Sequence, residues 1–223
     1  MTSFFVEFRL HGYANTHAKD VIRDVARRYR VRGMIRTRPV PHVGLYPPSS
    51  THDIREVIRT VQRVGRNYTL VPFSMRGFGC YRDSKVIYMD IEPSLVLKQL
   101  RTELTQELNS ALGKANPEYD FHTTIAFKDL GYKFDSIWEY IKAKEQPDID
   151  QYLLRITVLG KRSRIVCEYD LVLKRLLSRQ QALSRYWWRR TVDEMRRLRE
   201  GKAEQPTSII TRLRRSLADL FRL

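Results

Sequence analysis

One short pattern occurs twice in this chain, as Pro41-His42-Val43-Gly44-Leu45-Tyr46 and as Phe121-His122-Thr123-Thr124-Ile125-Ala126. Each copy has a histidine, a small residue two positions later and an aliphatic residue directly after that. Both copies favour β-strands, in which alternate side chains share a face. We therefore expect two polar strand faces, one with His42, Gly44 and Tyr46, and the other with His122, Thr124, Ala126 and Lys128.

The sequence around the two copies also repeats. Each half of the chain reads as a strand, a helix, a histidine-bearing strand, a helix and a strand. His42 follows Phe5 by 37 residues, and His122 follows Val86 by 36 residues. The matching intervals indicate an internal duplication. We predict an α+β protein in which two duplicated lobes place antiparallel sheets around a central cleft, with helices outside.

Two histidines on adjacent strands suit general acid and base chemistry at a phosphate. A neutral imidazole can remove a proton while an opposing imidazolium supplies one, and both forms exist near neutral pH. A hydroxyl two residues along the strand, as at Thr124, lies on the same face and can donate to a phosphoryl oxygen. A single strand histidine is more often a packed or surface residue, so the hypothesis depends on the two matching copies. The other histidines have no repeated context and are expected at the surface: His11, His17 and His52.

The composition favours a folded protein inside the cell. The 223 residues are 42% hydrophobic, enough for a full core, and no apolar run reaches the length of about 18 residues that a membrane span needs. The N-terminus lacks a basic segment followed by an apolar one, so a cytoplasmic location is expected. The two cysteines, Cys80 and Cys167, lack the spacing of zinc ligands or of a disulfide framework. No metal or cofactor is therefore expected.

The positive charge of the chain is uneven. Lys and Arg number 41 against 25 Asp and Glu, and the net charge of +16 favours a polyanionic partner. Residues 174–223 hold 14 Lys or Arg and 5 Asp or Glu, a net charge of +9, while residues 1–173 have a net charge of +7. We expect residues 1–173 to form the domain with the two histidines and residues 174–223 to form a basic, helical extension.

The extension has the pattern of basic amphipathic helices. Apolar residues recur at helical spacing from about Leu171 to Leu198, and again from Thr207 or Ser208 to Phe221 after a break at residues 201–206. Such helices can pack on their own domain, bind RNA, or dock on a membrane surface or a protein. Packing is the default expectation. RNA is favoured over a membrane because the histidine pattern indicates a nucleotide substrate.

The two copies of the pattern resemble the paired H-x-T/S-hydrophobic motifs of the 2H phosphoesterase superfamily. The 2′-5′ RNA ligase and cyclic nucleotide phosphodiesterase branch is the most similar, and the resemblance covers about residues 1–173. It implies a bilobal fold, a cleft that holds both motifs, and metal-free hydrolysis of 2′,3′-cyclic phosphates at RNA ends or on nucleotides. It makes His42 and His122 the acid and base pair, in either order, and Thr124 a phosphate-binding hydroxyl.

Gly44 departs from the family pattern, because Thr or Ser is usual at this position. Glycine has no side chain with which to donate a hydrogen bond to phosphate. The loss of one such donor costs on the order of 3 kcal/mol in transition-state stabilisation, about 100-fold in rate. Water, Tyr46 or a backbone N–H are the possible replacements. We therefore expect a phosphate-binding position at Gly44 that is weaker than its counterpart at Thr124.

Further candidates for the site come from residue type and position. Two cations are candidates to hold phosphate charge, with ordinary solvated side chains as the alternative: Lys128 and Arg76. Three aromatic residues are candidates to stack on a base, with core or rim packing as the alternative: Tyr46, Phe78 and Tyr81.

Three functions are compatible with this pattern. The leading hypothesis is an enzyme that processes RNA ends. The second is a non-catalytic protein that uses the cleft to recognise RNA ends, which the glycine at position 44 favours. The third makes the basic extension an interaction arm for a membrane or a protein. Turnover of a 2′,3′-cyclic nucleotide separates the first two, and salt-dependent RNA binding bears on the third.

Overall fold

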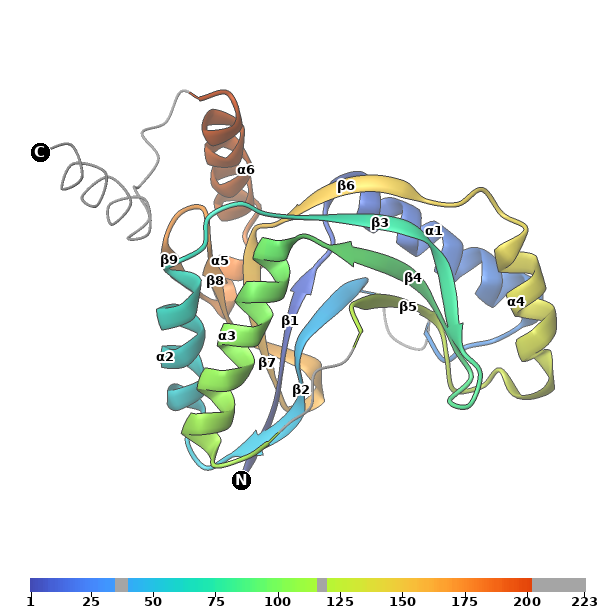
Figure 1. The fold of residues 1–223 in the computed structure, drawn as a ribbon, viewed down its shortest axis with the longest axis horizontal. Helices are drawn as coiled ribbons and strands as arrows, with labels where there is room; N and C mark the ends of the chain where they lie inside the picture. The colour runs from blue at the N-terminus through green and yellow to red at the C-terminus, as the bar shows by residue number, and fades with distance from the viewer. Residues whose placement is uncertain (35–39, 116–119, 202–223) are drawn as a thin grey trace, which may run out of the picture.

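The computed structural model describes residues 1–34, 40–115 and 120–201. This part of the chain forms two antiparallel sheets with helices around them, which confirms the predicted α+β class (Figure 1). The first sheet has the order β2-β1-β7-β8-β9, with β1 at Thr2–Arg9, β2 at His42–Thr51, β7 at Arg155–Gly160, β8 at Arg164–Asp170 and β9 at Arg175–Ser178. The second sheet has the order β5-β4-β3-β6, with β3 at Val71–Tyr81, β4 at Val86–Pro93, β5 at His122–Ala126 and β6 at Asp148–Leu153.

The two histidine strands pair with their neighbours in equivalent ways. β2 lies antiparallel to β1 at the edge of the first sheet, and β5 lies antiparallel to β4 at the edge of the second. The residues opposite His42 and Gly44 are Arg9 and Glu7, and the residues opposite His122 and Thr124 are Asp90 and Tyr88. Each motif therefore occupies the same register in its own sheet, as a duplication requires.

A β-bulge follows the small residue in both copies. Leu45 has no partner across from it in β1, and Ile125 has none in β4. A bulge adds one residue to one strand and reverses the alternation beyond it. Tyr46 therefore points to the core and not to the face of His42. It is fully buried, its ring stacks on Phe4 with centroids 5.8 Å apart, and its hydroxyl donates to Asn109. The prediction that Tyr46 stacks on a base is wrong for this reason.

The strands of the two sheets do not follow the order in which they occur in the sequence. The strand after the second helix, β3, pairs with β4 and β6 in the second sheet and does not complete the first. The first sheet is completed from the far end of the chain, where β7 pairs with β1 so that Phe5 lies opposite Leu159. The second sheet is thus built from one continuous stretch, residues 71–153, that is inserted between parts of the first.

Four helices cover the apolar faces of the sheets. They are α1 (Gly12–Tyr29), α2 (Ile54–Gly65), α3 (Leu95–Leu112) and α4 (Phe134–Lys142). α2 packs on β7 and β8, α3 packs on β2 and on the second sheet, α1 contacts β5, and α4 contacts β3. Helix α3 starts at Ser94, whose hydroxyl accepts a hydrogen bond from the Leu97 N–H at 3.1 Å. Its apolar stripe is fully buried: Leu97, Leu100, Leu104 and Leu108.

The predicted boundary between residues 173 and 174 falls inside the first sheet. The Asp170 carboxylate accepts hydrogen bonds from the N–H groups of Val172 and Leu173, and Lys174 has a φ of +53°. This tight turn returns the chain as β9, in which Leu177 is fully buried. Helical spacing of the leucines predicted a helix here, but the turn at Asp170 gives a strand instead.

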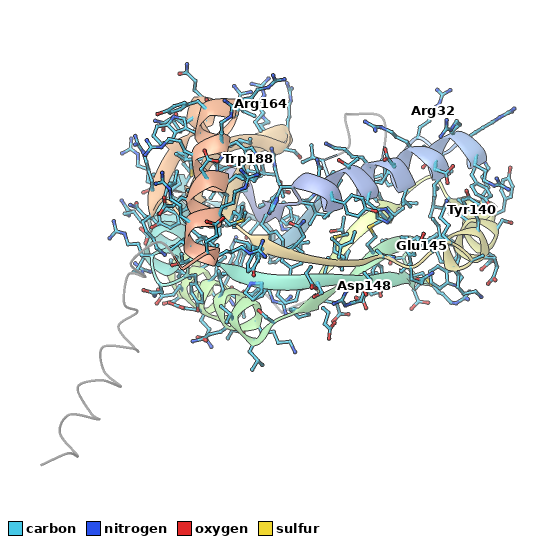
Figure 2. The ribbon with its side chains drawn as sticks, turned by 90° about the horizontal axis from the view of Figure 1, so that it is seen from above. Arg32, Tyr140, Glu145, Asp148, Arg164 and Trp188 are labelled. Carbon is cyan, nitrogen blue, oxygen red and sulfur yellow. The ribbon has the colours of Figure 1, made fainter. Side chains whose placement is uncertain are left out.

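Helix α6 (Arg185–Arg199) follows the short helix α5 (Arg179–Ala182) and packs on the polar face of the first sheet (Figures 1 and 2). A buried ionic cluster fixes it there. Arg155 donates to Asp170 at 2.9 Å and to Glu168 at 3.3 Å, and its third nitrogen donates to the hydroxyl of Thr191 on α6. Thr191 is fully buried and also contacts the Asp170 carboxylate. This part of the extension is therefore an integral part of the domain.

The predicted last helix, from Thr207 or Ser208 to Phe221, lies outside the described residues. Among the helices that the structure does describe, none is long and apolar enough to cross a membrane. The two cysteines are free and lie in different sheets, Cys80 in β3 and Cys167 in β8.

We expect Thr191→Val to destabilise the protein by about 1 to 3 kcal/mol. The change keeps the volume but leaves a buried nitrogen of Arg155 without its acceptor on α6. Urea unfolding followed by circular dichroism measures the loss. Thr16→Val is the matched control, because Thr16 is an exposed threonine of α1, and it should change stability by less than about 0.5 kcal/mol. Equal effects of the two variants would contradict the role of the cluster.

Candidate functional site

The two histidine strands lie side by side where the sheets meet (Figure 1). The hydroxyl of Thr123 in β5 donates to the backbone carbonyl of His42 in β2 at 3.2 Å, and Thr123 is fully buried. This hydrogen bond connects the edge of the first sheet to the edge of the second at the position of both motifs. The structure therefore brings the two sequence copies to one place.

Each histidine ring is held by the same local hydrogen bond. The Nδ1 atom of His42 lies 2.8 Å from the carbonyl oxygen of Val40, and the Nδ1 atom of His122 lies 2.9 Å from that of Asp120. A carbonyl oxygen can only accept, so Nδ1 carries the hydrogen in both rings. The Nε2 atom then has the lone pair of the neutral ring. Both imidazoles are thus fixed in the tautomer in which Nε2 can take up a proton.

The surroundings of the two rings differ. His42 has an edge contact with Phe5, with centroids 5.8 Å apart, and its Nε2 lies 3.7 Å from a carboxylate oxygen of Glu7. His122 packs against two tyrosines, with centroid distances of 5.5 Å to Tyr81 and 5.3 Å to Tyr88. An anionic group therefore borders one imidazole, and aromatic rings border the other.

The two positions for a phosphate-binding hydroxyl also differ. Thr124 lies opposite Tyr88, while Gly44 lies opposite Glu7, whose side chain is 2% exposed. Gly44 is buried and is not among the described glycines that have a positive φ. The backbone conformation there therefore does not require glycine.

Two charged residues of β1 were missed by the sequence analysis. Arg9 lies directly across from His42, and its Nε donates to Glu7 at 3.0 Å. Both side chains belong to the same strand face as His42, because residues opposite each other in a sheet project to the same side. A signal was present in the sequence, since Glu7 and Arg9 alternate with Val6, Phe8 and Leu10 in an otherwise apolar strand.

The two predicted phosphate-binding cations do not lie as expected. β5 ends at Ala126, and Lys128 has a φ of +71° with its Nζ over the ring of Phe127, so it does not continue the strand face of His122. Arg76 lies among the carboxylates of three neighbouring residues: Glu92, Asp148 and Asp150. These carboxylates, on β4 and β6, form ion pairs with the guanidinium of Arg76 on β3. Lys128 therefore leaves the strand face of His122, whereas Arg76 stays on that face with its guanidinium paired to carboxylates.

The remaining aromatic candidates separate by strand face. Phe78 lies opposite the buried Met89 and packs against the core, so its predicted role in base stacking is wrong. Tyr81 lies on the other face, where its ring is 4.6 Å from Tyr88 and borders His122. Burial raises the pKa of Tyr81, so its hydroxyl stays protonated. Gly79 makes this arrangement possible, because a Cβ there would come within 2.5 Å of the Tyr88 ring.

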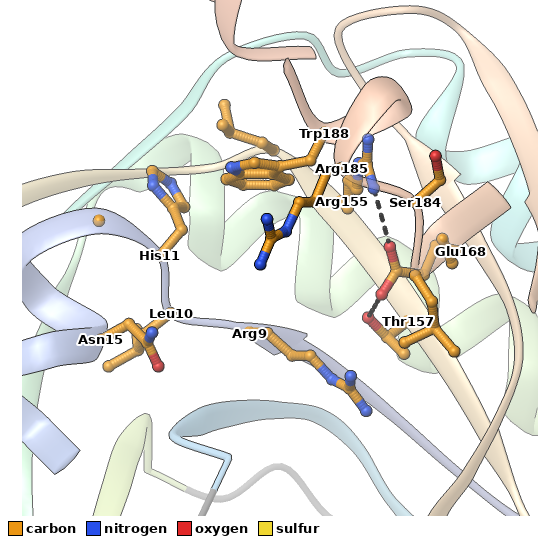
Figure 3. A pocket seen from close by; sticks show the side chains of 14 residues that line it. Arg9, Leu10, His11, Asn15, Arg155, Thr157, Glu168, Ser184, Arg185 and Trp188 are labelled. Carbon is orange, nitrogen blue, oxygen red and sulfur yellow. Dashed lines mark hydrogen bonds and ion pairs between the residues drawn. The ribbon is translucent and has the colours of Figure 1, made fainter. Parts of the chain in front are cut away.

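A pocket of about 370 Å³ lies on the same polar face of the first sheet, beneath α6 (Figure 3). Its polar and aromatic lining includes Arg9, His11, Asn15, Arg155, Thr157, Glu168, Arg185 and Trp188. We refer to it as the α6 pocket. Contrary to expectation, His11 is not a surface residue, because its ring packs 5.3 Å from Trp188 and its Nε2 lies 2.9 Å from the carbonyl of Tyr152.

Comparison with known proteins gives one family and several similar structures. The family model of the 2′-5′ RNA ligase superfamily matches residues 15–162. A Geobacillus kaustophilus protein that carries the provisional name phosphoesterase is 26% identical over 130 residues, which are 56% of this chain and 73% of that protein. The crystal structure of TT0787 of Thermus thermophilus has a TM-score of 0.53 at 13% identity and covers 77% of this chain and 98% of its own, which shows a shared fold. E. coli LigT with NADP+ has a TM-score of 0.48 at 14% identity, covering 74% of this chain and 92% of its own.

We expect the stability contributed by His11 to depend on pH. Burial lowers the pKa of His11 below its ordinary value of 6.5, so the folded state favours the neutral ring. As the pH falls, His11 in the unfolded chain takes up a proton before His11 in the folded chain does. The stability that His11 contributes is therefore present above pH 6.5 and is lost as the pH falls below it. The difference in unfolding free energy between wild type and His11→Gln, measured from pH 8 to pH 5, should shrink in that interval. The exposed His52 provides the control variant His52→Gln. A difference that is constant with pH would contradict the burial of a neutral His11.

Proposed function

This chain belongs to the 2′-5′ RNA ligase superfamily, and we propose on that premise that it is a phosphoesterase that opens 2′,3′-cyclic phosphates at RNA ends or on nucleotides. One observation carries the proposal. His42 and His122 lie on neighbouring strands, and each ring is held through Nδ1 by the carbonyl two residues before it. Two imidazoles in one tautomer, with both Nε2 atoms able to exchange protons, are what acid and base catalysis at a phosphate needs.

The proposed reaction uses the two histidines in complementary states. One neutral imidazole accepts a proton at Nε2 from a water molecule as the water oxygen attacks phosphorus. The bond from phosphorus to one ribose oxygen breaks, and the opposing imidazolium gives its Nε2 proton to that oxygen. The product is a ribose phosphate monoester with one free hydroxyl, and each histidine ends in the state in which the other began. Groups of this kind typically contribute 10² to 10⁴-fold to the rate.

The residues that border the histidines can stabilise the charge on the phosphate. Thr124 can donate its hydroxyl from the face of His122. The first motif lacks such a donor at Gly44, and Arg9, directly across from His42, is the cation that can take its place. A guanidinium can donate two parallel hydrogen bonds to a phosphate. We propose that Arg9 compensates for the glycine, with Glu7 holding its Nε.

A non-catalytic protein that binds RNA ends is the alternative, and the glycine at position 44 favours it. Such a protein would keep the cleft and the cations without the need for a complete set of transition-state donors. Turnover separates the two functions. The test is incubation of the purified chain, in the presence of EDTA, with RNA that ends in a 2′,3′-cyclic phosphate, followed by identification of the product.

We expect His42→Ala and His122→Ala each to lower turnover of a nucleoside 2′,3′-cyclic phosphate by at least about 100-fold, because each removes one proton-transfer group. Steady-state hydrolysis is measured beside a thermal unfolding curve that verifies folding. EDTA should leave wild-type activity unchanged. Near wild-type rates in either variant would refute the paired mechanism, and activity that disappears with EDTA and returns with a divalent ion would refute the metal-free one.

Substitutions at the two hydroxyl positions should act in opposite directions. Gly44→Thr is expected to maintain or raise turnover, since the backbone conformation there does not require glycine and a hydroxyl adds a donor. Thr124→Ala should lower kcat by roughly 10 to 100-fold, because it removes a donor to developing charge. Arg9→Gln should lower kcat more in the wild type than in Gly44→Thr if the guanidinium replaces the missing hydroxyl. Equal losses in both backgrounds would show that Arg9 does not compensate for the glycine.

A further inference from the structure

We propose that the α6 pocket binds the nucleotide that precedes the terminal one on a single RNA strand, so that the preferred substrate is an oligonucleotide and not a mononucleotide. This inference rests on the proposed function, because the proposed function places the terminal nucleotide of the strand at the histidines. The pocket itself is defined by position, lining and rigidity, each of which is independent of catalysis.

The position of the pocket makes it an extension of the candidate site. Arg9 lies directly across from His42 and also lines the pocket, so the two regions share a side chain. The pocket then continues over Thr157 on β7 and Glu168 on β8, which face the same side as Arg9. At a spacing of about 4.8 Å between strands, β8 lies about 14 Å from β2 across the sheet. A ligand that reaches from His42 into the pocket is therefore an extended one.

The lining of the pocket suits a base with its phosphate. Trp188 and His11 form an aromatic wall, and aromatic side chains bind the bases of single strands with little regard to sequence (Figure 3). Arg185 has no carboxylate partner among the described residues, and Arg9 keeps part of its guanidinium for a ligand because only its Nε bonds to Glu7. Glu168 is the acidic lining residue, and it is already paired with Arg155 and Thr157. The pocket therefore offers positive charge beside aromatic surface.

The pocket is rigid because α6, which covers it, is held in place by hydrogen bonds. Thr191 of α6 is held by the buried Arg155 and Asp170, and the guanidinium of Arg155 lies 5.1 Å from the centre of the Trp188 ring. Trp188 and Arg185 thus approach the sheet from a helix that is locked in place. A preformed site loses less conformational freedom when a flexible strand binds.

A second hollow shares His11 with the α6 pocket and is bordered on α6 by Met195 and Arg199. The carboxylates of Glu92 and Asp150 also line it, so the positive charge that suits a phosphate lies in the α6 pocket and not in this hollow. The family match ends at residue 162, before the helix begins. The side of the pocket that Arg185 and Trp188 form therefore lies outside the matched family region, while Asn15, Arg155 and Thr157 lie inside it.

The test is binding of a fluorescein-labelled hexauridylate with a 3′-phosphate end, measured by fluorescence anisotropy with the full chain. Arg185→Gln and Trp188→Leu should each weaken binding by about 5-fold or more, the lower end of what loss of a stacking partner costs. Arg185→Gln should also reduce the slope of log K against log salt concentration by about 0.7. Trp188→Phe keeps an aromatic surface and should retain more affinity than Trp188→Leu, which separates stacking from loss of folding.

Matched controls come from the same helix. Trp187 contacts Arg175 and Arg190 and does not line the pocket, and Arg190 is exposed. Trp187→Leu and Arg190→Gln should leave the affinity within twofold of wild type. Equal losses in Arg190→Gln and Arg185→Gln would overturn the pocket in favour of diffuse attraction to a basic helix, and unchanged affinity in Arg185→Gln and Trp188→Leu would overturn it as well.

A competition experiment with uridine 3′-monophosphate tests the claim that a strand is bound. It should displace hexauridylate only at concentrations far above the Kd of the oligonucleotide. Displacement at a concentration close to that Kd would show that the pocket binds a mononucleotide and not a strand. Binding needs no turnover, so failure of the proposed function would appear as absent hydrolysis with the Arg185 and Trp188 effects intact. Failure of the pocket would appear as hydrolysis that depends on the histidines, with binding indifferent to these two residues.

Discussion

The register of each histidine strand against its central strand is the constraint on which the arrangement depends. β1 and β4 each bury one face in the hydrophobic core and present polar residues on the other. A slip of one residue in either pair would turn a histidine into the core and an apolar residue onto the polar face, at a large cost in buried surface. The apolar alternation of Val6 and Phe8 therefore sets where His42 points. The chemistry is positioned by packing on the opposite side of the sheet.

The buried cluster around Arg155 has a different role. Removing a guanidinium and two carboxylates from water is expensive, and such a cluster is often no more stabilising than apolar residues of the same size. Its value lies in geometry, because Arg155 has defined acceptors on β8 and on α6. An apolar contact would allow α6 to slide along the sheet. The hydrogen bonds of Arg155 hold α6, and with it Trp188 and Arg185, at a fixed position over the sheet.

The sequence predicted the α+β class, the duplication and the paired motifs, because strand alternation and motif spacing are local signals. It failed where one residue changes the local geometry. The bulge at Leu45 turned Tyr46 into the core, and the φ of Lys128 took that side chain off its strand. Leucines at helical spacing predicted a helix where the chain forms β9. The hydrogen bonds from Val172 and Leu173 to Asp170 that turn the chain there cannot be read from the spacing of apolar residues. The proximity of Arg9 to His42 depends on strand pairing, which one sequence does not reveal.

The insertion of the second sheet into the first has a consequence for synthesis of the protein. β1 pairs with β7, and the partners Phe5 and Leu159 are separated in the chain by β2 and by the whole second sheet. At roughly 5 to 20 residues per second, the ribosome needs about 8 to 30 s to release β7 after β1. During that time the antiparallel pair of β1 and β2 has an unpaired edge, and β6, the last strand of the second sheet, is made directly before β7. The nascent chain therefore completes its lobes in the reverse of their order in the gene, and the half that carries His42 is finished last.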